Sequence, residues 1–363
     1  MIYRSIGIMS GSSLDGLDIA FVEFVETAGK WTYEIIHADC IGYSKEWGDK
    51  LKNAVSLSAL DYQLLHTEYG HYIGKQVNAF IEKYGLEHKV NLIASHGHTT
   101  FHLPQQQVTA QLGDGAAIAA ETKLSVVSDL RSLDVALGGQ GAPIVPIGEK
   151  LLFVGYDYFL NIGGIANISI SYEGKYVAYD VCAANRVLNL LAAEKGLAFD
   201  DGGKLAASGN IKVELLTELN SLEYYSNPYP KSLANSFGTD EVFPMIKAHR
   251  VSVEDGLRTY VEHIALQVRN AVDDGQQTTD DRKEKKLLVT GGGAMNHFLI
   301  ERLKDLLTDR NIEIVVPDEK TIQYKEAVIM ALIGILRWRE EENVLPSVTG
   351  AMRGSVGGAL WIG

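Results

Sequence analysis

The sequence predicts an α/β fold of two similar lobes, and glycine-rich turns in both halves of the chain support this prediction. Residues 3–24 and 159–170 each contain an apolar strand-like stretch, a turn with glycines, and a second strand-like stretch. This order is typical of a β-hairpin. Because one such hairpin lies near the start of residues 1–150 and the other near the start of residues 151–363, we expect duplication of a single α/β unit.

The first turn also carries groups that suit a nucleotide. Residues 10–18 hold two glycines, three hydroxyls and two carboxylates. Glycines let backbone N–H groups converge on an anion such as a phosphate, and the serines add donors. Asp15 or Asp18 can hold a metal-bound water or position a nucleophile. A polar hairpin without a ligand is the alternative, because such turns are common.

Two later stretches extend the pattern. Apolar residues follow the second hairpin and end in Asp180, and a third glycine turn at 291–293 lies between an apolar strand and a helical pattern. The third turn lets an adenosine approach the backbone closely. Two lobes with a phosphate turn from each are the layout of actin, hexokinase and Hsp70. We therefore expect a two-lobed actin-like ATPase fold, a duplicated RNase H-like fold with an interlobe cleft.

The other elements follow in order along an N-terminal lobe, residues 1–150, and a C-terminal lobe, residues 151–363. Glycines and a proline at 138–143 indicate the connection between them. In the first lobe we expect a strand at 31–36, helices at 51–57 and 62–84, a strand at 90–94, a helix at 114–122 and a strand at 124–128.

In the second lobe the hairpin leads to helices. The prediction leaves open whether the last of these helices packs back on the first lobe. We expect a helix at 187–195, irregular segments, a long helix at 253–272, a charged loop at 275–286 and a helix at 325–340. Ligands of open α/β sheets bind beyond the carboxyl ends of the strands. This rule places site candidates at 95–98, 129–134, 180–185 and 291–293.

Composition predicts a soluble intracellular protein. With 46% hydrophobic residues the chain can bury a sizeable core. A net charge of −13 argues against general nucleic-acid binding, which needs Lys and Arg. Cys40 and Cys182 give no disulfide framework, no signal-peptide pattern opens the chain, and no apolar run is long enough to span a bilayer. We expect a cytoplasmic protein without a membrane partner; a homodimer is compatible with the sequence.

The motifs resemble those of the anhydro-N-acetylmuramic acid kinases, in the same order along nearly the whole chain. The stretches that carry the resemblance are 7–18, 95–99, 111–114, 129–131 with Asp134, 138–146, 161–168, Asp180, 230–232, 291–294 with Asn296, 326–327 and 345–351. The number of collinear matches makes chance a poor explanation.

The resemblance implies a kinase that converts 1,6-anhydro-N-acetylmuramic acid, ATP and water into N-acetylmuramic acid 6-phosphate during cell-wall recycling. A carboxylate acts as general base on a water that attacks C1. The freed O6 then attacks the γ-phosphate in line, while Mg²⁺ and backbone donors neutralise the developing charge. The implied cofactors are ATP and Mg²⁺, with the ion carried by ATP and no direct protein ligand.

The same resemblance implies roles for individual residues. Asp180 matches the base, and Glu326 is a lesser candidate that orients water or sugar. On the sugar side we expect His96, His98, Thr99, Arg131 and Asp134, with Arg131 suited to the lactyl carboxylate. The residues expected to bind the nucleotide are Gly11, Ser12, Ser13, Leu14, Asp15, Gly16, Leu17, Asp18, Asn161, Gly163, Gly164, Gly291, Gly292 and Gly293.

The sequence departs from the family pattern directly after the expected base. The family usually has Thr-Gly-Pro-Gly/Ala-Asn there, whereas Val-Cys-Ala-Ala occupies 181–184 before Asn185. A hydroxyl and a glycine near the phosphates are thereby lost. Smaller departures are Ser12 for Thr, His98 for Gln, Leu-Ala-Asn at 233–235 for Gly-Arg-Glu, and the absence of a His at 148–150.

Each assignment has a structural alternative. Asp180 can cap the next helix, Asp15 and Asp18 can cap their hairpin, the histidines can be structural, and Arg131 can pair with Asp129 or Asp134. For the whole protein, the alternative is a catalytically weakened sugar-binding or sensor homologue. An ATPase acting on proteins is a weaker reading, because no further module fits in 363 residues, and no Walker motif is present.

Overall fold

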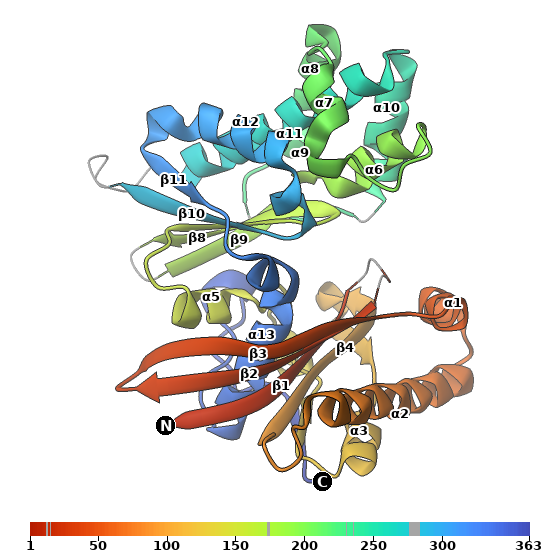
Figure 1. Cartoon of the computed structure of the whole chain (residues 1–363), viewed down its shortest axis with the longest axis vertical. Coiled ribbons are helices and arrows are strands. Elements are labelled where there is room, and N and C mark those ends of the chain that lie inside the picture. The colour runs from red at the N-terminus through yellow and green to blue at the C-terminus, as the bar shows by residue number, and fades with distance from the viewer. Residues whose placement is uncertain (12–13, 15, 173–174, 230, 235, 276–283) are drawn as a thin grey trace. The chain divides into compact units, whose positions relative to one another are not determined.

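The computed structural model describes the chain except for residues 12–13, 15, 173–174, 230, 235 and 276–283 (Figure 1). The chain forms two compact units. Unit 1 consists of Met1–Val154 and Tyr324–Gly363, and unit 2 consists of Gly155–Gln323. The C-terminal 40 residues, 324–363, thus belong to the same unit as the N-terminus.

Unit 1 is built on a seven-stranded sheet. Its strands are β1 (Ile2–Ser10), β2 (Gly16–Thr27), β3 (Lys30–Gly42), β4 (Leu92–Leu103), β5 (Val108–Leu112), β6 (Val126–Ser128) and β12 (Ala359–Trp361). The order is β12-β6-β4-β1-β2-β3, with β5 paired to β4. Strands β1 to β3 form an antiparallel meander, and β4 and β6 continue the sheet in parallel.

Helices cover the two faces of this sheet and form two cores. One core contains apolar residues of α2 (Ala59–Tyr84), and the other contains those of α13 (Glu319–Trp338). The remaining helices of this unit are α1 (Lys45–Asn53), α3 (Gly115–Thr122), α4 (Ser132–Ala136), α5 (Pro146–Leu152) and α14 (Pro346–Thr349). Because an added Cβ at Gly7 would overlap the Ala327 carbonyl oxygen, α13 lies directly against β1.

Unit 2 repeats the same strand order on its own sheet. Its strands are β7 (Tyr158–Ile162), β8 (Ile165–Tyr172), β9 (Lys175–Ala183), β10 (Lys285–Thr290) and β11 (Ile312–Val315), in the order β11-β10-β7-β8-β9. Here too an antiparallel meander of three strands is extended by two parallel strands on the side of its first strand. The repeated order confirms the predicted duplicated α/β fold.

The helices of unit 2 pack around α11 (Val253–Gly275). They are α6 (Asn185–Ala193), α7 (Lys204–Ser208), α8 (Val213–Asn220), α9 (Glu223–Ser226), α10 (Phe243–Ala248) and α12 (His297–Leu307). The prediction of irregular structure between the first and the long helix was wrong, because four short helices occupy much of this stretch. Helices of four to eight residues present too few turns for a periodic apolar pattern. None of the described helices combines the length and the hydropathy needed to cross a membrane.

Candidate functional site

The turn of the β1–β2 hairpin lies in unit 1. Ser10 lies opposite Leu17, and residues 11–15 connect the end of β1 at Ser10 to the start of β2 at Gly16. The Leu14 N–H donates to the Gly11 carbonyl at 3.4 Å, and Leu14 has a φ of 57°, in the left-handed region. The predicted phosphate ligands that fall outside the described residues are Ser12, Ser13 and Asp15.

The first residues of β2 divide between the core and the surface of the hairpin. Leu17 is fully buried in the core, so only its backbone is available to a ligand. Gly16 packs tightly against β3, because an added Cβ would lie 2.6 Å from Cys40 Sγ. Asp18 is partly exposed, and its charge adds to the effect of burial, which raises the pKa of Tyr43 to about 12. Asp18 is therefore a partly exposed carboxylate close to the turn.

A buried chain of hydrogen bonds anchors the end of β1. The Ser10 hydroxyl lies 3.2 Å from His98 Nδ1 and accepts a hydrogen bond from the Tyr43 hydroxyl at 2.8 Å. Tyr43 in turn lies 2.6 Å from the Tyr69 hydroxyl. Burial lowers the pKa of His98, so its imidazole is neutral near pH 7. The chain fixes His98 of β4 beside the last residue before the turn.

Arg131, which is partly buried, and the buried His96 form a second group in unit 1. Arg131 Nε donates to His96 Nε2 at 2.8 Å, so the imidazole proton must lie on Nδ1, which donates to the Gly97 carbonyl at 2.8 Å. Burial and the Arg131 charge lower the pKa of His96 to about 3. Burial lowers the pKa of Arg131 to about 10, against the opposing effects of Glu326 and Asp134. A neutral imidazole thus orients a charged guanidinium.

Asp134 holds the glycine-rich loop that follows α4. Its Oδ2 accepts from the Gly141 N–H at 2.7 Å, and its Oδ1 accepts from the Thr349 hydroxyl at 2.8 Å. Arg131 Nη1 donates to the Gly141 carbonyl at 2.6 Å. The carboxylate is fully buried, so its described contacts position the loop. Thr99, the remaining residue predicted on the sugar side, is exposed on β4.

Glu326 lies on α13 next to a buried ion pair. Burial raises the pKa of Glu326, while the Lys325 and Arg131 charges lower it. Lys325 Nζ lies 3.1 Å from Glu149 Oε1, and both side chains are buried. The other oxygen of Glu149 is buried without a hydrogen-bond partner among the described residues. Because α13 packs closely on β1, Lys325 and Glu326 of α13 are held next to the sheet of unit 1.

In unit 2 the β7–β8 turn is tied to the start of α6. The Gly163 carbonyl accepts from the Asn185 N–H at 3.0 Å, and the Gly164 carbonyl accepts from the Ala184 N–H at 2.8 Å. The Asn185 side chain donates to the Ile162 carbonyl at 3.0 Å. Turn and helix therefore form one hydrogen-bonded structure.

Asp180 lies within β9, at an irregularity of the sheet. It pairs with Asn167, whereas the next pair is Cys182 with Ala166, so Val181 is an inserted residue of a β-bulge. Bulges are common next to active sites, where they redirect a side chain. Asp180 Oδ2 accepts from the Leu233 N–H at 2.9 Å. Burial raises the pKa of Asp180, against the effect of that hydrogen bond.

The third glycine turn packs on the end of β7. Gly291 has a φ of 79°, and an added Cβ would lie 2.6 Å from Asn161 Oδ1. An added Cβ at Gly292 would lie 3.6 Å from the Asn185 amide nitrogen. The hydroxyl of Thr290 is buried and has no hydrogen-bond partner among the described residues. The predicted nucleotide residues of unit 2 therefore lie together at one edge of its sheet.

Sequence reasoning missed several residues that the structure places in these groups. Gly141 and Thr349 lie in stretches that carry the family resemblance, but no role was predicted for either residue, because their contacts to Asp134 depend on the folded loop and, for Thr349, join residues 215 positions apart. Tyr43 and Glu149 are recognisable only from the hydrogen-bonded groups that surround them. Arg186 directly follows the predicted segment 180–185, and this position was a usable signal.

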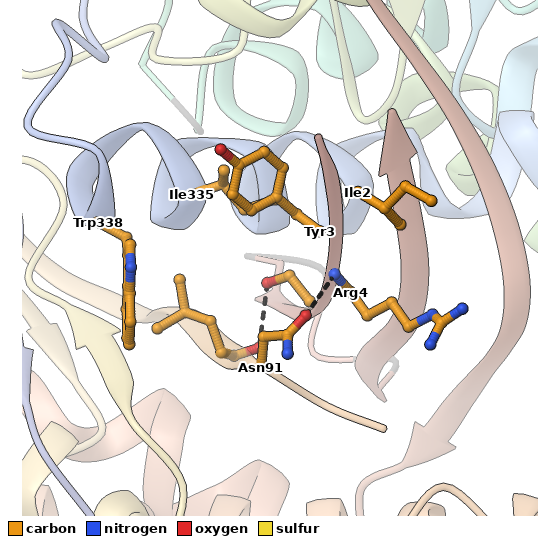
Figure 2. Close-up of a pocket in the computed structure, with 8 residues that line it drawn as sticks. Ile2, Tyr3, Arg4, Asn91, Ile335 and Trp338 are labelled. Carbon is orange, nitrogen blue, oxygen red and sulfur yellow. Dashed lines mark hydrogen bonds between the residues drawn. The ribbon is translucent and has the colours of Figure 1, made fainter. Parts of the chain in front are cut away.

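A pocket of about 250 Å³ lies at the opposite end of β1 from the hairpin turn (Figure 2). Asn91 accepts from the Arg4 N–H at 2.9 Å in its wall. Its lining residues are Ile2, Tyr3, Arg4, Ser5, Asn91, Leu92, Ile335 and Trp338. None of them is a predicted site residue. Across the described residues, no cluster of three or more His, Cys, Asp or Glu side chains is placed to hold a metal ion.

Comparison with known proteins identifies the family. The family model for anhydro-N-acetylmuramic acid kinase matches residues 3–363. An anhydro-N-acetylmuramic acid kinase of Haemophilus influenzae is 34% identical over 98% of this chain and 97% of its own length. One of a Sulfurovum species is 33% identical over 99% of both chains.

Solved structures are more distant. An activator of 2-hydroxyisocaproyl-CoA dehydratase from Clostridium difficile, with bound ADPNP, has a TM-score of 0.47 and 14% sequence identity. The match covers 93% of this chain and 96% of that one. The family match and the identities to the relatives are decisive: the chain belongs to the anhydro-N-acetylmuramic acid kinase family and is a phosphotransferase.

Proposed function

We propose that this protein is an ATP-dependent kinase that opens 1,6-anhydro-N-acetylmuramic acid with water and phosphorylates its O6, giving N-acetylmuramic acid 6-phosphate. Family membership supports the reaction. The observation that carries it is Asp180, a partly buried carboxylate at a β-bulge. One of its oxygens accepts a hydrogen bond from the Leu233 N–H, and its pKa is raised. A general base needs this combination of fixed position and raised basicity.

In the proposed reaction Asp180 accepts a proton from a water molecule as the water oxygen attacks C1 of the bicyclic sugar. The C1–O6 bond breaks, and O6 forms a bond to the γ-phosphorus of ATP as ADP leaves. Such a transfer depends on positioning and on neutralisation of the phosphate charge. The carboxylate must be ionised to begin, so protonation of Asp180 stops the first step.

Backbone groups of the glycine-rich turns are proposed to bind ATP. They are those of residues 11–18 in the first hairpin and those of the 291–293 turn, which lies beside Asn161, Gly163 and Gly164. The Asp18 carboxylate would accept hydrogen bonds from water molecules bound to Mg²⁺. When bound, Mg²⁺ neutralises charge on the β- and γ-phosphates.

Arg131 is proposed to bind the lactyl carboxylate of the sugar. Its Nε and Nη1 donate to His96 and Gly141, and no described residue accepts a hydrogen bond from Nη2. A guanidinium held at two nitrogens presents the third in a fixed direction. His96, Asp134 and Thr349 then act as positioning residues for Arg131 and its loop, and Glu326 orients water or sugar.

Phosphate transfer from ATP to the purified anhydro-sugar tests the proposal, with N-acetylmuramic acid and N-acetylglucosamine as control acceptors. We expect a 6-phosphate product from the anhydro-sugar in the presence of Mg²⁺. Sugar binding without any product from a folded sample would instead favour the sugar-binding or sensor homologue. The buried apolar residues 181–184, with Cys182 fully buried, are the observation behind that second candidate.

A further inference from the structure

Arg186 lies over the β7–β8 turn. A Cβ built on Gly164 would lie 3.6 Å from Arg186 Nε and 3.7 Å from Arg186 Nη2. Two guanidinium nitrogens therefore face the glycine from nearly the same distance. Because Gly164 has no side chain, the guanidinium sits directly against the turn.

The backbone at the start of α6 has other partners. The N–H groups of Ala184, Asn185 and Arg186 donate to the Gly163 and Gly164 carbonyls, at 2.8, 3.0 and 3.4 Å respectively. Helix N-termini often bind phosphate through such groups, but these three are used to hold the turn. A phosphate at this place therefore needs a donor from a side chain.

The neighbouring side chains supply few donors. Val181, Ala183 and Ala184 carry none, and the Cys182 thiol is fully buried, with its pKa raised by burial. Lys231 lies near Asp180, but its Nζ is 4.9 Å from the centre of the Tyr224 ring and points its hydrogens at the Tyr224 and Tyr225 carbonyls. Among the described residues around this turn, Arg186 is a cation that lies against the turn itself.

We propose that Arg186 binds the terminal phosphates of the nucleotide at the Gly163–Gly164 turn, and this inference rests on the proposed function. A guanidinium has five N–H donors in a planar fork that matches two phosphate oxygens. Gly164 beneath it has no side chain that would displace the guanidinium from the turn. The buried Thr290 hydroxyl, which has no described partner on the adjacent strand, is a further group available to a ligand at this edge.

The test compares nucleotide affinities of Arg186→Gln and Arg186→Lys with those of the unaltered protein. Calorimetry with Mg-ATP, Mg-ADP and AMP measures binding without catalysis. We expect Arg186→Gln to weaken ATP binding about tenfold to a hundredfold, as for loss of a charge-assisted hydrogen bond, and to leave AMP binding unchanged. Arg186→Lys should recover part of the affinity, because it keeps the charge and loses the fork. Arg250→Gln removes an equal charge from an exposed position in the same unit and is the matched control.

The outcomes separate this inference from the proposed function. Equal ATP affinity for Arg186→Gln and Arg250→Gln, or equal weakening of ATP and AMP binding, overturns the role of Arg186 whether or not the protein is a kinase. Selective loss of ATP affinity, with no sugar phosphorylated by the unaltered protein, upholds Arg186 and rejects the kinase. Should Arg186→Gln not fold, Arg186→Lys decides, since unchanged ATP affinity there contradicts a bidentate contact.

Discussion

At the scale of single residues, Asp180 is the sharpest test. Asp180→Asn keeps the shape of the side chain and removes its basicity, so we expect kcat to fall about 10²–10⁴-fold while ATP affinity is retained. Initial rates and calorimetry measure the two quantities, with Asp49→Asn as an exposed control. A rate within about threefold of the unaltered protein would show that another group takes the proton.

The raised pKa of Asp180 predicts the pH profile. Burial raises this pKa above the ordinary value of 3.8, and only the ionised carboxylate accepts a proton. Activity should therefore fall as pH decreases through the raised pKa, so that the acid limb of kcat/KM lies above pH 3.8. An acid limb at or below that value, measured over a range where the protein stays folded, contradicts the assignment.

Arg131 offers a prediction about the sugar alone. Arg131→Gln should raise KM for the anhydro-sugar at least about tenfold and leave KM for ATP unchanged, because one charge-assisted contact to a carboxylate is lost. Arg4→Gln, which removes an exposed arginine paired with Glu23, is the control. Parallel increases in both KM values would indicate a general disturbance of unit 1.

At the scale of elements, the contact of α13 with β1 depends on Gly7. Gly7→Ala places a Cβ on the Ala327 carbonyl oxygen, so the helix must move. We expect a loss of about 1–3 kcal/mol in the free energy of unfolding, as for other overpacked sites. Gly48→Ala in α1 meets no atom within 4 Å and should be neutral or stabilising. Denaturant unfolding of both variants measures the difference, and equal stabilities would disprove the close contact.

The ion pair between α5 and α13 makes a second prediction at this scale. Glu149→Gln leaves the buried Lys325 charge unpaired, so we expect the free energy of unfolding to fall by about 3–5 kcal/mol. Glu68→Gln breaks a more exposed pair with Lys50 and should cost about 0–1 kcal/mol. Combining Glu149→Gln with Lys325→Met should recover much of the loss. No recovery in the double variant would mean that Glu149 stabilises the unit by other contacts.

At the scale of the whole molecule, the sequence predicted the duplication because each hairpin is formed by residues close together in the chain. Within its strands, apolar and polar residues alternate over a few positions. The sequence predicted the glycine turns for the same reason. It placed Asp180 at the end of a strand, whereas the structure has Asp180 inside β9. It did not predict β12, whose three residues are too few for a pattern, or the contact of Asp134 with Thr349, which joins residues 215 positions apart. It also gave no sign that Val181 would form a bulge, since a bulge depends on the register of two strands.

The return of the C-terminus to unit 1 leads to a last prediction. The core of unit 2 lies entirely within residues 155–323, whereas one core of unit 1 contains Ala327, the run 328–333, Ile335 and Leu336 from α13. A chain ending at residue 323 should therefore lose the fold of unit 1 and keep that of unit 2. Hydrogen exchange read out by mass spectrometry resolves the units: we expect rapid exchange in β1, β2 and β4 and protection in β7, β10 and α11. Full protection of β1 without α13 would show that the N-terminal segment folds alone, and the helix would then be a covering rather than part of the core.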